Sequence, residues 1–459
     1  MPLAAQLADP VSAANFPTTV LRWRNERWAD AVGLGGLDEP AWTGHFGRFE
    51  PLPGNLPQPL AMRYHGHQFG TYNPDLGDGR GFLFAQLRDG AGRLLDLGTK
   101  GSGQTPWSRR GDGRLTLKGG VREILAASYL EALGVNTSKA FSLIETGESL
   151  ERNDEPSPTR GSVLVRLSHS HVRFGTFQRC AWLEDREAMA ALVDYCVAEF
   201  HPGADDPDMS RKACALLERA ALATGRMIGQ WMAAGFVHGV MNTDNFNITG
   251  ETFDFGPWRF LPHSDPNFTA AYFDQNGLYR FGRQPVQGSW ALQQLASALL
   301  LLADAEDLAP ALTSYEPAYR ESFAAHTHAL LGLTPTGDLA SDIAFLQAFY
   351  GWMTESGANW PQTFFDWFCA SEARANASLQ AGLYAAPAFA PVRAALLARA
   401  PCRPERLALP YFQRPAPVSL LIDEVEALWD PIAASDDWSA FKAKTDHIEE
   451  ARTALGLGA

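Results

Sequence analysis

The residues with the clearest chemical potential lie in two short segments of the second half of the chain. The first, His238-Gly-Val-Met-Asn-Thr-Asp-Asn245, places a carboxylate beside an amide, and the second, Asp254-Phe-Gly256, begins with another carboxylate. A hard cation on a triphosphate prefers oxygen ligands, here from two nearby segments. The two segments therefore predict a metal-bound nucleotide site, with Asn245 and Asp254 as ligands of Mg²⁺ or, alternatively, Mn²⁺.

The spacing of these segments is similar to that of protein kinases, which carry H-R-D-x-x-x-x-N and then D-F-G. With His238 on the motif His, Asn245 takes the place of the metal-binding Asn and Asp254 that of the metal-binding Asp. Ile248 and Phe253 are then expected in short strands that connect the two segments.

One kinase residue is missing, because Val240 stands where kinases carry the catalytic Asp. Valine cannot accept a proton, and the nearest replacement carboxylate is Asp244. We expect Asp244 to act as a general base that deprotonates or orients an attacking hydroxyl. For an isolated Asp-Asn pair, capping of a turn is the plainer explanation, and the surrounding motif favours the catalytic one.

Candidate phosphate ligands lie upstream, in a basic region of an acidic chain. From Arg80 to Arg179 there are 15 Lys/Arg against 10 Asp/Glu, whereas the whole chain has a net charge of -14. Lys100 ends an expected strand and Glu123 lies early in an expected helix, and such a pair positions phosphates in kinases. A surface ion pair of little energetic value is the alternative.

Glycines and arginines complete the predicted phosphate site. Gly77-Asp-Gly-Arg-Gly81 lets backbone N–H groups approach an anion closely, although a hairpin turn explains the same residues. Gly111-Asp-Gly-Arg114 has the same character. Arg166 and Arg173 can clamp phosphates through their guanidinium forks, with ordinary salt bridges as the alternative.

The elements that must position these residues change along the chain from strands to helices. Short apolar runs over 81–87, 94–100 and 162–167 predict antiparallel strands. Helical periodicity over 120–134, 214–234 and 290–303 predicts helices. This order favours an α+β fold over a βαβ fold. We expect a wrapping segment over 1–60, a strand-rich N-lobe over 61–180, a helical C-lobe over 181–310, and a helical extension over 311–459.

Composition limits the functional classes. The chain of 459 residues, 46% hydrophobic and 20% charged, is typical of a folded protein. Its negative charge disfavours nucleic-acid partners. Its longest aliphatic run, over 298–303, is too short for a membrane span. Neither a secretory signal nor a C-x-x-C pair among the five cysteines is present, so we expect a cytoplasmic protein with reduced thiols and no membrane partner.

The chain resembles the SelO (selenoprotein O) family of pseudokinase-like protein adenylyltransferases. The resemblance covers about residues 60 to 300 and rests on seven segments: Gly66-His-Gln-Phe-Gly70, Leu76-Gly-Asp-Gly-Arg-Gly81, Lys100-Gly101, Gly111-Asp-Gly-Arg114, Arg122-Glu123, His171-Val-Arg-Phe-Gly175 and Gly235-Phe-Val-His-Gly-Val-Met-Asn-Thr-Asp-Asn245. It implies a two-lobed protein-kinase-like fold. It also implies that ATP binds flipped, with the α-phosphate presented to Ser, Thr or Tyr hydroxyls of a protein, and leaves UTP open as a second donor of a nucleotide.

The resemblance also implies roles for individual residues. Asp244 is the implied proton acceptor, Asn245 and Asp254 are the implied metal ligands, and Glu123 supports Lys100. The implied nucleotide ligands are Gly77, Gly79, Arg80, Lys100, Asp112, Gly113, Arg166, Arg173 and Asp254. Family members commonly carry a redox-active Cys or selenocysteine near the C-terminus, whereas the last cysteine here is Cys402, so little redox control is expected.

Three functions remain open at this point. The first is transfer of AMP to proteins, the second is an atypical protein or small-molecule kinase that uses Asp244 as its base, and the third is an inactive ATP-binding scaffold. Val240 disfavours the kinase. The predicted metal ligands Asn245 and Asp254 disfavour the scaffold, which does not need them.

Overall fold

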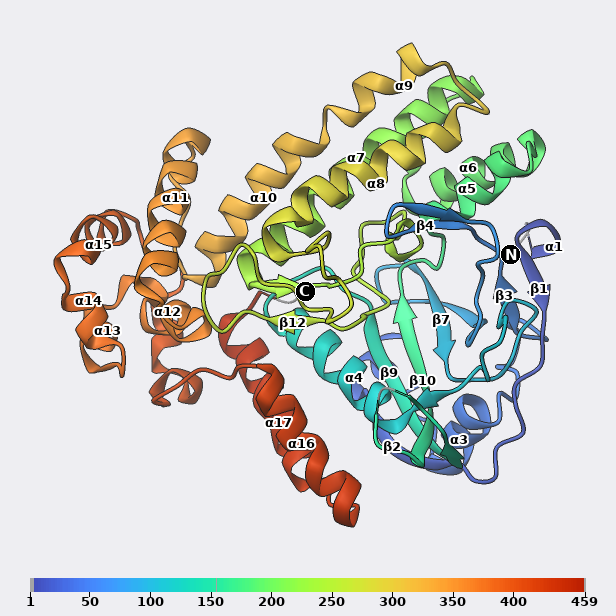
Figure 1. Ribbon diagram of the computed structural model, residues 1–459, viewed down its shortest axis with the longest axis horizontal. Coiled ribbons are helices and arrows are strands. Elements are labelled where there is room, and N and C mark those ends of the chain that lie inside the picture. Colours follow the sequence, from blue (N-terminus) through green and yellow to red (C-terminus); the bar gives the residue numbers. More distant parts are fainter. Residues whose placement is uncertain (1–3, 154, 458–459) are drawn as a thin grey trace.

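The first part of the chain builds an eight-stranded antiparallel sheet, which the computed structural model shows as curled (Figure 1). The structure describes residues 4–153 and 155–457. Seven strands follow the order β1-β3-β6-β7-β10-β9-β2, and β8 pairs with β10. Their bounds are β1 Ala8–Pro10, β2 Val20–Arg24, β3 Leu60–Met62, β6 Leu83–Arg88, β7 Leu94–Lys100, β8 Leu115–Thr116, β9 Lys139–Leu150 and β10 Thr159–Ser168.

The N-terminal segment supplies both edges of this sheet. Strand β1 pairs with β3 at one edge and β2 pairs with β9 at the other. Three helices belong to the same segment: α1 Ala4–Leu7, α2 Glu26–Ala31 and α3 Glu39–Gly47. Trp42 and Phe46 of α3 pack on Phe141 of β9, with ring centroids 5.1 and 5.4 Å from that ring. Residues 4–60 therefore extend from one sheet edge to the other and share its core.

Helix α4, Leu117–Ala132, covers one side of the sheet and carries Glu123. Thr116 caps its first turn by accepting a hydrogen bond from the Gly119 amide at 3.1 Å, which satisfies a free N–H of the helix start. Leu133 ends the helix, and Gly134 follows with a positive φ of 75°. The helix predicted over 120–134 is thus confirmed, one turn longer at its start.

Long helices dominate the chain after residue 173 (Figure 1). Their bounds are α5 Phe174–Trp182, α6 Arg186–Phe200, α7 Met209–Ala234, α8 Gln284–Leu299, α9 Ala305–Leu312 and α10 Tyr315–Leu330. Helix α7 packs against both α8 and α10. The helices predicted over 214–234 and 290–303 correspond to α7 and α8. Both begin five or six residues earlier than predicted.

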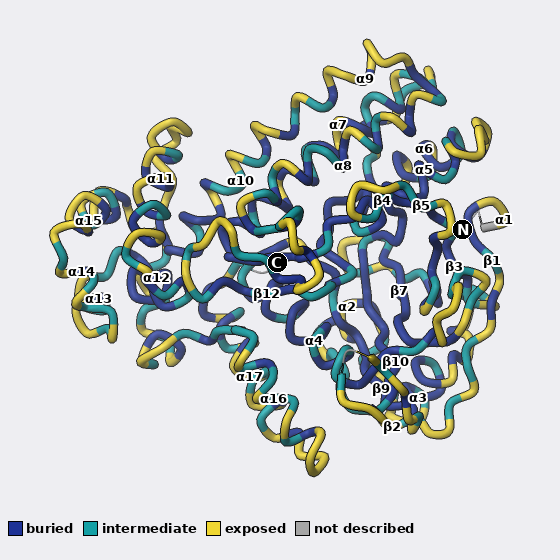
Figure 2. The backbone as a smooth tube through the Cα atoms, in the orientation of Figure 1, coloured by how far each residue is buried: buried dark blue, intermediate teal, exposed yellow. Residues whose placement is uncertain are grey.

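The last third is also helical and forms an outer part of the molecule. It contains α11 Leu339–Ser356, α12 Trp360–Asp366, α13 Glu372–Ala377, α14 Ala381–Ala385, α15 Ala390–Leu397, α16 Ile422–Ser435 and α17 Ser439–Leu455. Helix α17 returns to pack on α4. Most helices of this part keep one buried and one exposed side (Figure 2), whereas α12 is buried almost throughout. Across residues 4–153 and 155–457, every helix is too short or too polar to cross a bilayer.

The strands predicted around Ile248 and Phe253 are wrong. The structure has single bridges one residue away, between Asn247 and Arg173 and between Thr252 and Thr137. Gly250 lies against α7, where an added Cβ would stand 2.6 Å from the backbone of Ala223. The segment must therefore turn tightly, and each arm pairs with a distant part of the chain instead of extending as a strand. The short pair in this region is β11 Phe236–Val237 with β12 Arg259–Phe260.

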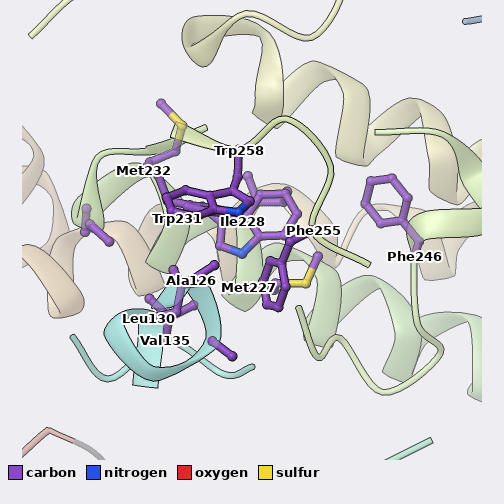
Figure 3. Packing of buried hydrophobic residues seen from close by; sticks show 14 of the residues in the cluster. Ala126, Leu130, Val135, Met227, Ile228, Trp231, Met232, Phe246, Phe255 and Trp258 are labelled. Atoms are coloured by element: carbon purple, nitrogen blue, oxygen red, sulfur yellow. The ribbon is translucent and has the colours of Figure 1, made fainter. Parts of the chain in front are cut away.

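A buried aromatic cluster fixes the loop between β11 and β12 on helix α7 (Figure 3). Trp231 of α7 donates a hydrogen bond from Nε1 to Thr252 Oγ1 at 2.7 Å and stacks on His238 with ring centroids 5.3 Å apart. His238 Nε2 lies 3.3 Å from the Phe253 carbonyl oxygen. Burial lowers the pKa of His238 to about 4, so this ring is neutral and holds the two arms of the loop together.

We predict that Trp231→Ala lowers the free energy of unfolding by about 3–5 kcal/mol, the usual cost of a large aromatic removed from a core. Trp231 is 1% exposed, whereas Trp182, at 59%, supplies a matched substitution on the surface. Trp182→Ala should cost much less. Urea unfolding followed by circular dichroism measures both, and equal losses would contradict the anchoring role of Trp231.

Candidate nucleotide and active site

The predicted site residues line one polar cleft of about 760 Å³ between the sheet and the loops after β11. Of the predicted site residues, only Glu123 is absent from the lining of this cleft. The lining includes Gly77, Gly79, Arg80, Lys100, Asp112, Gly113, Arg166, Arg173, Asp244, Asn245 and Asp254. These residues are spread over nearly 180 positions of the chain, and the fold brings them to a single cavity.

Strand register places two of the cations. In the antiparallel pair of β7 and β10, Leu164 lies opposite Lys100. Because side chains alternate along a strand, Arg166, two residues after Leu164, faces the same side of the sheet as Lys100. The third cation, Arg173, lies directly before helix α5 as its N-cap residue. All three are buried, so water screens their charges poorly.

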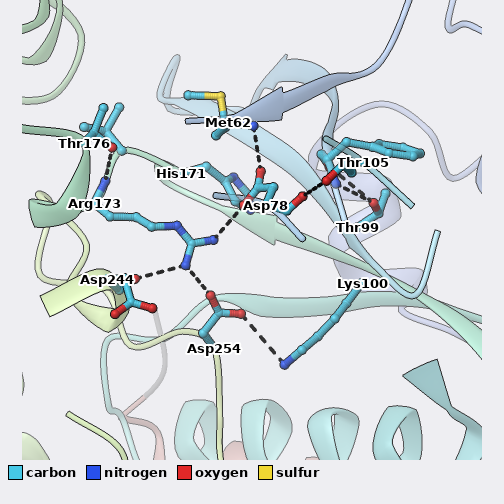
Figure 4. A network of polar contacts seen from close by, with 12 residues as sticks. Met62, Asp78, Thr99, Lys100, Thr105, His171, Arg173, Thr176, Asp244 and Asp254 are labelled. Carbon is cyan, nitrogen blue, oxygen red and sulfur yellow. Dashed lines mark hydrogen bonds and ion pairs between the residues drawn. The ribbon is translucent and has the colours of Figure 1, made fainter. Parts of the chain in front are cut away.

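Asp254 receives these three cations, of which Figure 4 shows Lys100 and Arg173. Its Oδ1 accepts a hydrogen bond from Arg166 Nη1 at 2.5 Å and lies 3.8 Å from Lys100 Nζ, while its Oδ2 forms an ion pair with Arg173. Burial alone would raise the pKa of Asp254, but the neighbouring Arg166, Arg173 and Lys100 hold that pKa well below its usual range. Asp254 is therefore a permanent anion with an excess of positive charge around it.

Lys100 also forms a buried ion pair with Glu123 of α4. The sequence left open whether this pair is a solvated surface contact, and the structure places both side chains at less than a tenth exposed. A surface pair contributes little to stability, whereas breaking a buried pair is costly. Glu123 thus fixes the position of the Lys100 ammonium at the cleft wall.

Arg173 organises the floor of the cleft. Besides Asp254, its guanidinium donates to the Asp244 carbonyl oxygen at 3.0 Å and to Asp78 Oδ1 at 3.2 Å. Asp78 in turn accepts a hydrogen bond from the Met62 amide at 3.0 Å. Asp78 was not predicted as a site residue, although it lies inside the glycine-rich segment 77–81. Its partner Arg173 is 95 positions away in the chain, and a contact over such a separation leaves no pattern in the sequence.

Asp244 lies in a short helical turn, Thr243–Asn245, and is buried in the cleft wall. Its Oδ1 is buried and makes no hydrogen bond within the described residues. A Cβ at Gly66 would stand 2.8 Å from this oxygen, so only glycine leaves room for the carboxylate. Burial raises the pKa of Asp244 to about 6, and the nearby Arg173 opposes the rise. Such a carboxylate can exchange a proton near neutral pH.

The oxygens of Asn245 and Asp254 suit a hard cation. Asn245 donates from Nδ2 to the Val240 carbonyl oxygen at 3.0 Å, so its amide oxygen is the group that remains to coordinate. In the described part of the chain, no three His, Cys, Asp or Glu side chains gather as a metal site. The donor set is one amide and one carboxylate, and both are hard oxygen ligands of the kind that Mg²⁺ prefers.

The glycine-rich loops have a packing role that the sequence did not reveal. A Cβ at Gly77 would stand 2.4 Å from the ring of Trp107, and one at Gly79 would stand 2.9 Å from its carbonyl oxygen. Trp107 therefore lies directly on this loop. The alternative of a hairpin turn is excluded, because β6 pairs with β3 and β7 while β5, Thr71–Asn73, pairs with β4, Gly66–Gln68.

The cleft rim carries additional arginines that the sequence analysis did not single out. Arg109, Arg110 and Arg152 line the cavity, and Arg152 binds the Asp112 carboxylate with a nitrogen–oxygen distance of 2.8 Å. The predicted nucleotide ligand Asp112 is thus half-exposed and held by an arginine. The excess of basic residues over 80–179 provided the only signal for this rim.

Comparison with known proteins places the chain in a family. A family model described as "Protein adenylyltransferase SelO" matches residues 2–394. A protein nucleotidyltransferase YdiU of Synechocystis sp. is 49% identical over 342 residues, which are 73% of this chain and 70% of the relative. The YdiU of Synechococcus elongatus is 49% identical over 70% of this chain and 64% of its own length. The YdiU of Gloeobacter violaceus is 42% identical over 94% of this chain and 90% of the relative.

We predict that Asp254→Asn destabilises the protein by about 3–5 kcal/mol, because it leaves three buried cations without their shared anion. Inorganic tripolyphosphate should raise the melting temperature of this variant by more than that of the wild type, since it supplies the missing negative charge. Thermal unfolding with and without tripolyphosphate measures both effects.

The control for this prediction is Asp206→Asn, which removes the carboxylate from an exposed pair with Arg211. It should leave the melting temperature nearly unchanged. If Asp254→Asn melted like this control, the three cations would not depend on Asp254.

Proposed function

The chain belongs to the SelO family of protein adenylyltransferases, and on this premise we propose that it transfers AMP from ATP to Ser, Thr or Tyr hydroxyls of proteins. Its class as a protein nucleotidyltransferase follows from the family. The acceptor residues, the metal and the roles of individual side chains are the proposal. The observation that carries it is Asp244, a buried carboxylate with a pKa of about 6 beside the cleft, in a loop that has Val240 at the kinase base position.

We propose a two-lobed, kinase-like arrangement for the region around the cleft. The sheet with α4 would be the N-lobe, over residues 61–180, and the helices from α6 to α9 the C-lobe, over 181–310. Residues 311–459 would be a helical extension. This proposal is supported by the position of the cleft, which takes its lining from β7 and β10 on one side and from residues 240–256 on the other.

The basic residues of the cleft would hold the triphosphate. Lys100, Arg166 and Arg173 meet at Asp254, and the whole lining of the cleft carries eight Lys or Arg against five Asp or Glu, so the cleft attracts a polyanion. Arg80 and the loops with Gly77, Gly79, Asp112 and Gly113 would bind the nucleotide at the open side. Planar guanidinium groups suit phosphate oxygens because they donate two parallel hydrogen bonds.

Mg²⁺ would be held by Asn245 and Asp254. When bound, such an ion neutralises phosphate charge and polarises the phosphorus that is attacked. The chain's own contribution is to keep Asp254 ionised at every working pH and to fix the Asn245 amide through its bond to Val240. Mn²⁺ has the same preference for oxygen ligands and would use the same two residues.

Asp244 would take the proton of the acceptor hydroxyl as the oxygen attacks the α-phosphorus, and pyrophosphate would leave. This assignment requires the α-phosphate to face the acceptor, as expected for the flipped nucleotide. Arg173 holds the Asp244 backbone carbonyl in place, and Gly66 leaves room for the carboxylate. The proton would therefore move to the Asp244 carboxylate, whose backbone is held by Arg173 and whose side chain fits against Gly66.

We predict that Asp244→Asn lowers transfer of AMP about 10²-fold or more, the usual scale for loss of a general base, while ATP still binds. Val240→Asp should leave transfer unchanged or lower it, because it brings a negative charge towards the phosphates. Labelling of acceptor protein from α-³²P and γ-³²P ATP, with ATP binding measured in parallel, tests both variants. Label from α alone supports the proposal. Label from γ alone that increases in Val240→Asp would establish a kinase.

The raised pKa of Asp244 predicts a pH dependence. The base works only when ionised, so kcat/KM should fall as the pH decreases through about 6 and level off above it. Asp244→Asn should retain a small rate without this acidic limb. The measurement is kcat/KM between pH 5 and pH 8 at constant ionic strength, and a limb that persists in Asp244→Asn would assign it to another group.

A further inference from the structure

Three aromatic side chains stand exposed near the nucleotide cleft. Phe69 follows β4, and Tyr272 and Phe273 lie in the loop that follows β12. They are 40%, 84% and 46% exposed. The ring centroids of Phe69 and Phe273 are 5.9 Å apart, and those of Tyr272 and Phe273 are 5.1 Å apart. We call these three residues the aromatic rim. Exposed aromatic rings in contact with one another form an apolar patch, which commonly marks a binding surface.

The rim is attached to the loop that carries Asp244. The Phe69 amide donates hydrogen bonds to Asn242 Oδ1 at 3.1 Å and to the Tyr279 hydroxyl at 3.2 Å. The same Asn242 oxygen accepts from the Tyr279 hydroxyl at 2.8 Å. Two residues earlier, in β4, the His67 amide donates to Thr243 Oγ1 at 2.7 Å. These bonds hold Phe69 against Asn242, which lies two residues before the predicted base Asp244.

The backbone of Phe69 adopts an unfavourable conformation. Its φ is +50°, in the left-handed region, which a bulky residue adopts only where the surroundings impose it. Here the surroundings are the hydrogen bonds to Asn242 and Tyr279 and the contact of its ring with Tyr279, with ring centroids 4.9 Å apart. Strain of this kind concentrates at functional sites, and here it holds a partly exposed aromatic ring beside the loop of Asp244.

The other two residues of the rim line a cavity next to the nucleotide cleft. Tyr272 and Phe273 belong to the lining of this second cavity, which has a volume of about 490 Å³. Arg80, Lys100 and Phe255 line both this cavity and the nucleotide cleft, so the two cavities adjoin. Two of the three rim residues therefore lie beside the cleft that Asp244 lines.

We propose that the aromatic rim binds an apolar side chain of the acceptor protein, adjacent in sequence to the hydroxyl residue that receives AMP. This inference rests on the proposed function. The acceptor must come to Asp244, and the rim is an apolar surface bonded to the same loop. Exposed aromatic residues are frequent anchors of protein recognition. The enzyme would therefore prefer Leu or Phe over Ala beside the modified hydroxyl.

The test uses pairs of hydroxyl peptides that differ only in Leu or Ala beside the Ser, Thr or Tyr. Transfer from α-³²P ATP is measured with the wild type and with a Tyr272→Ala, Phe273→Ala double variant. The wild type should show a lower KM for the Leu peptide. The double variant should raise this KM about tenfold or more, as for loss of an interface anchor, and should no longer distinguish the two peptides, while its Kd for ATP stays unchanged.

Matched variants test whether the change in peptide KM comes from loss of the aromatic rings. Tyr272→Phe keeps the ring without the hydroxyl and should behave like the wild type. Phe69→Gly removes the third ring, suits the positive φ, and should raise the peptide KM without lowering the melting temperature. Leu379→Ala changes an exposed apolar residue, 89% exposed, and should have no effect.

Several results would overturn this proposal. An unchanged peptide KM in the double variant would overturn it while leaving the proposed function intact, as would a loss of peptide binding in Tyr272→Phe equal to that in the double variant. A wild-type dimer that dissociates in the double variant with normal transfer would show the rim to be a contact between two copies. Absence of α-label transfer by the wild type to any acceptor would overturn the proposed function and this inference together.

Discussion

The site depends on one buried carboxylate that is surrounded by more positive charge than it can neutralise. Asp254 meets Arg166, Arg173 and Lys100 in a region with little water. Bringing three cations together is unfavourable without anions, and Asp78, Glu123 and Asp254 supply negative charge next to them. Over the whole lining of the cleft, eight Lys or Arg stand against five Asp or Glu, and this excess attracts a polyanion. The gathering of cations around Asp254 therefore stabilises the folded site and also creates affinity for a triphosphate. It requires that rigid parts of the fold hold each cation in place.

The fold meets this requirement with elements that are far apart in the chain. Register between β7 and β10 aligns Lys100 with Arg166, and the start of α5 presents Arg173. Trp231 of α7 binds the loop on which Asp244 and Asp254 lie. Asp254 itself has a φ of +55°, an unfavourable conformation that its ion pairs and the bridge at Thr252 impose. Strain at this residue is consistent with a functional position.

Much of this arrangement was predictable from the sequence, and the remainder depends on long-range contacts. Periodicity and glycine boundaries predicted β6, β7, β10, α4 and α7, and spacing brought Asn245 and Asp254 together. By contrast, some residues acquire their roles only through partners many positions away in the chain. These are Asp78, Gly66 and the Arg152–Asp112 pair. The failed strands at Ile248 and Phe253 show the same limit, because contact of Gly250 with α7 decides the path of that segment. Local pattern specifies elements, and tertiary packing specifies which side chains share a cavity.

The central claim is that the bond broken in ATP lies between the α- and β-phosphates. The most direct measurement is the identity of the co-product, followed by ³¹P NMR of the enzyme with unlabelled ATP, Mg²⁺ and an acceptor protein. The account predicts that pyrophosphate appears in a one-to-one ratio with modified acceptor and that Asp244→Asn stops both. Formation of ADP in step with modified acceptor would contradict it, because phosphate rather than AMP would then have been transferred.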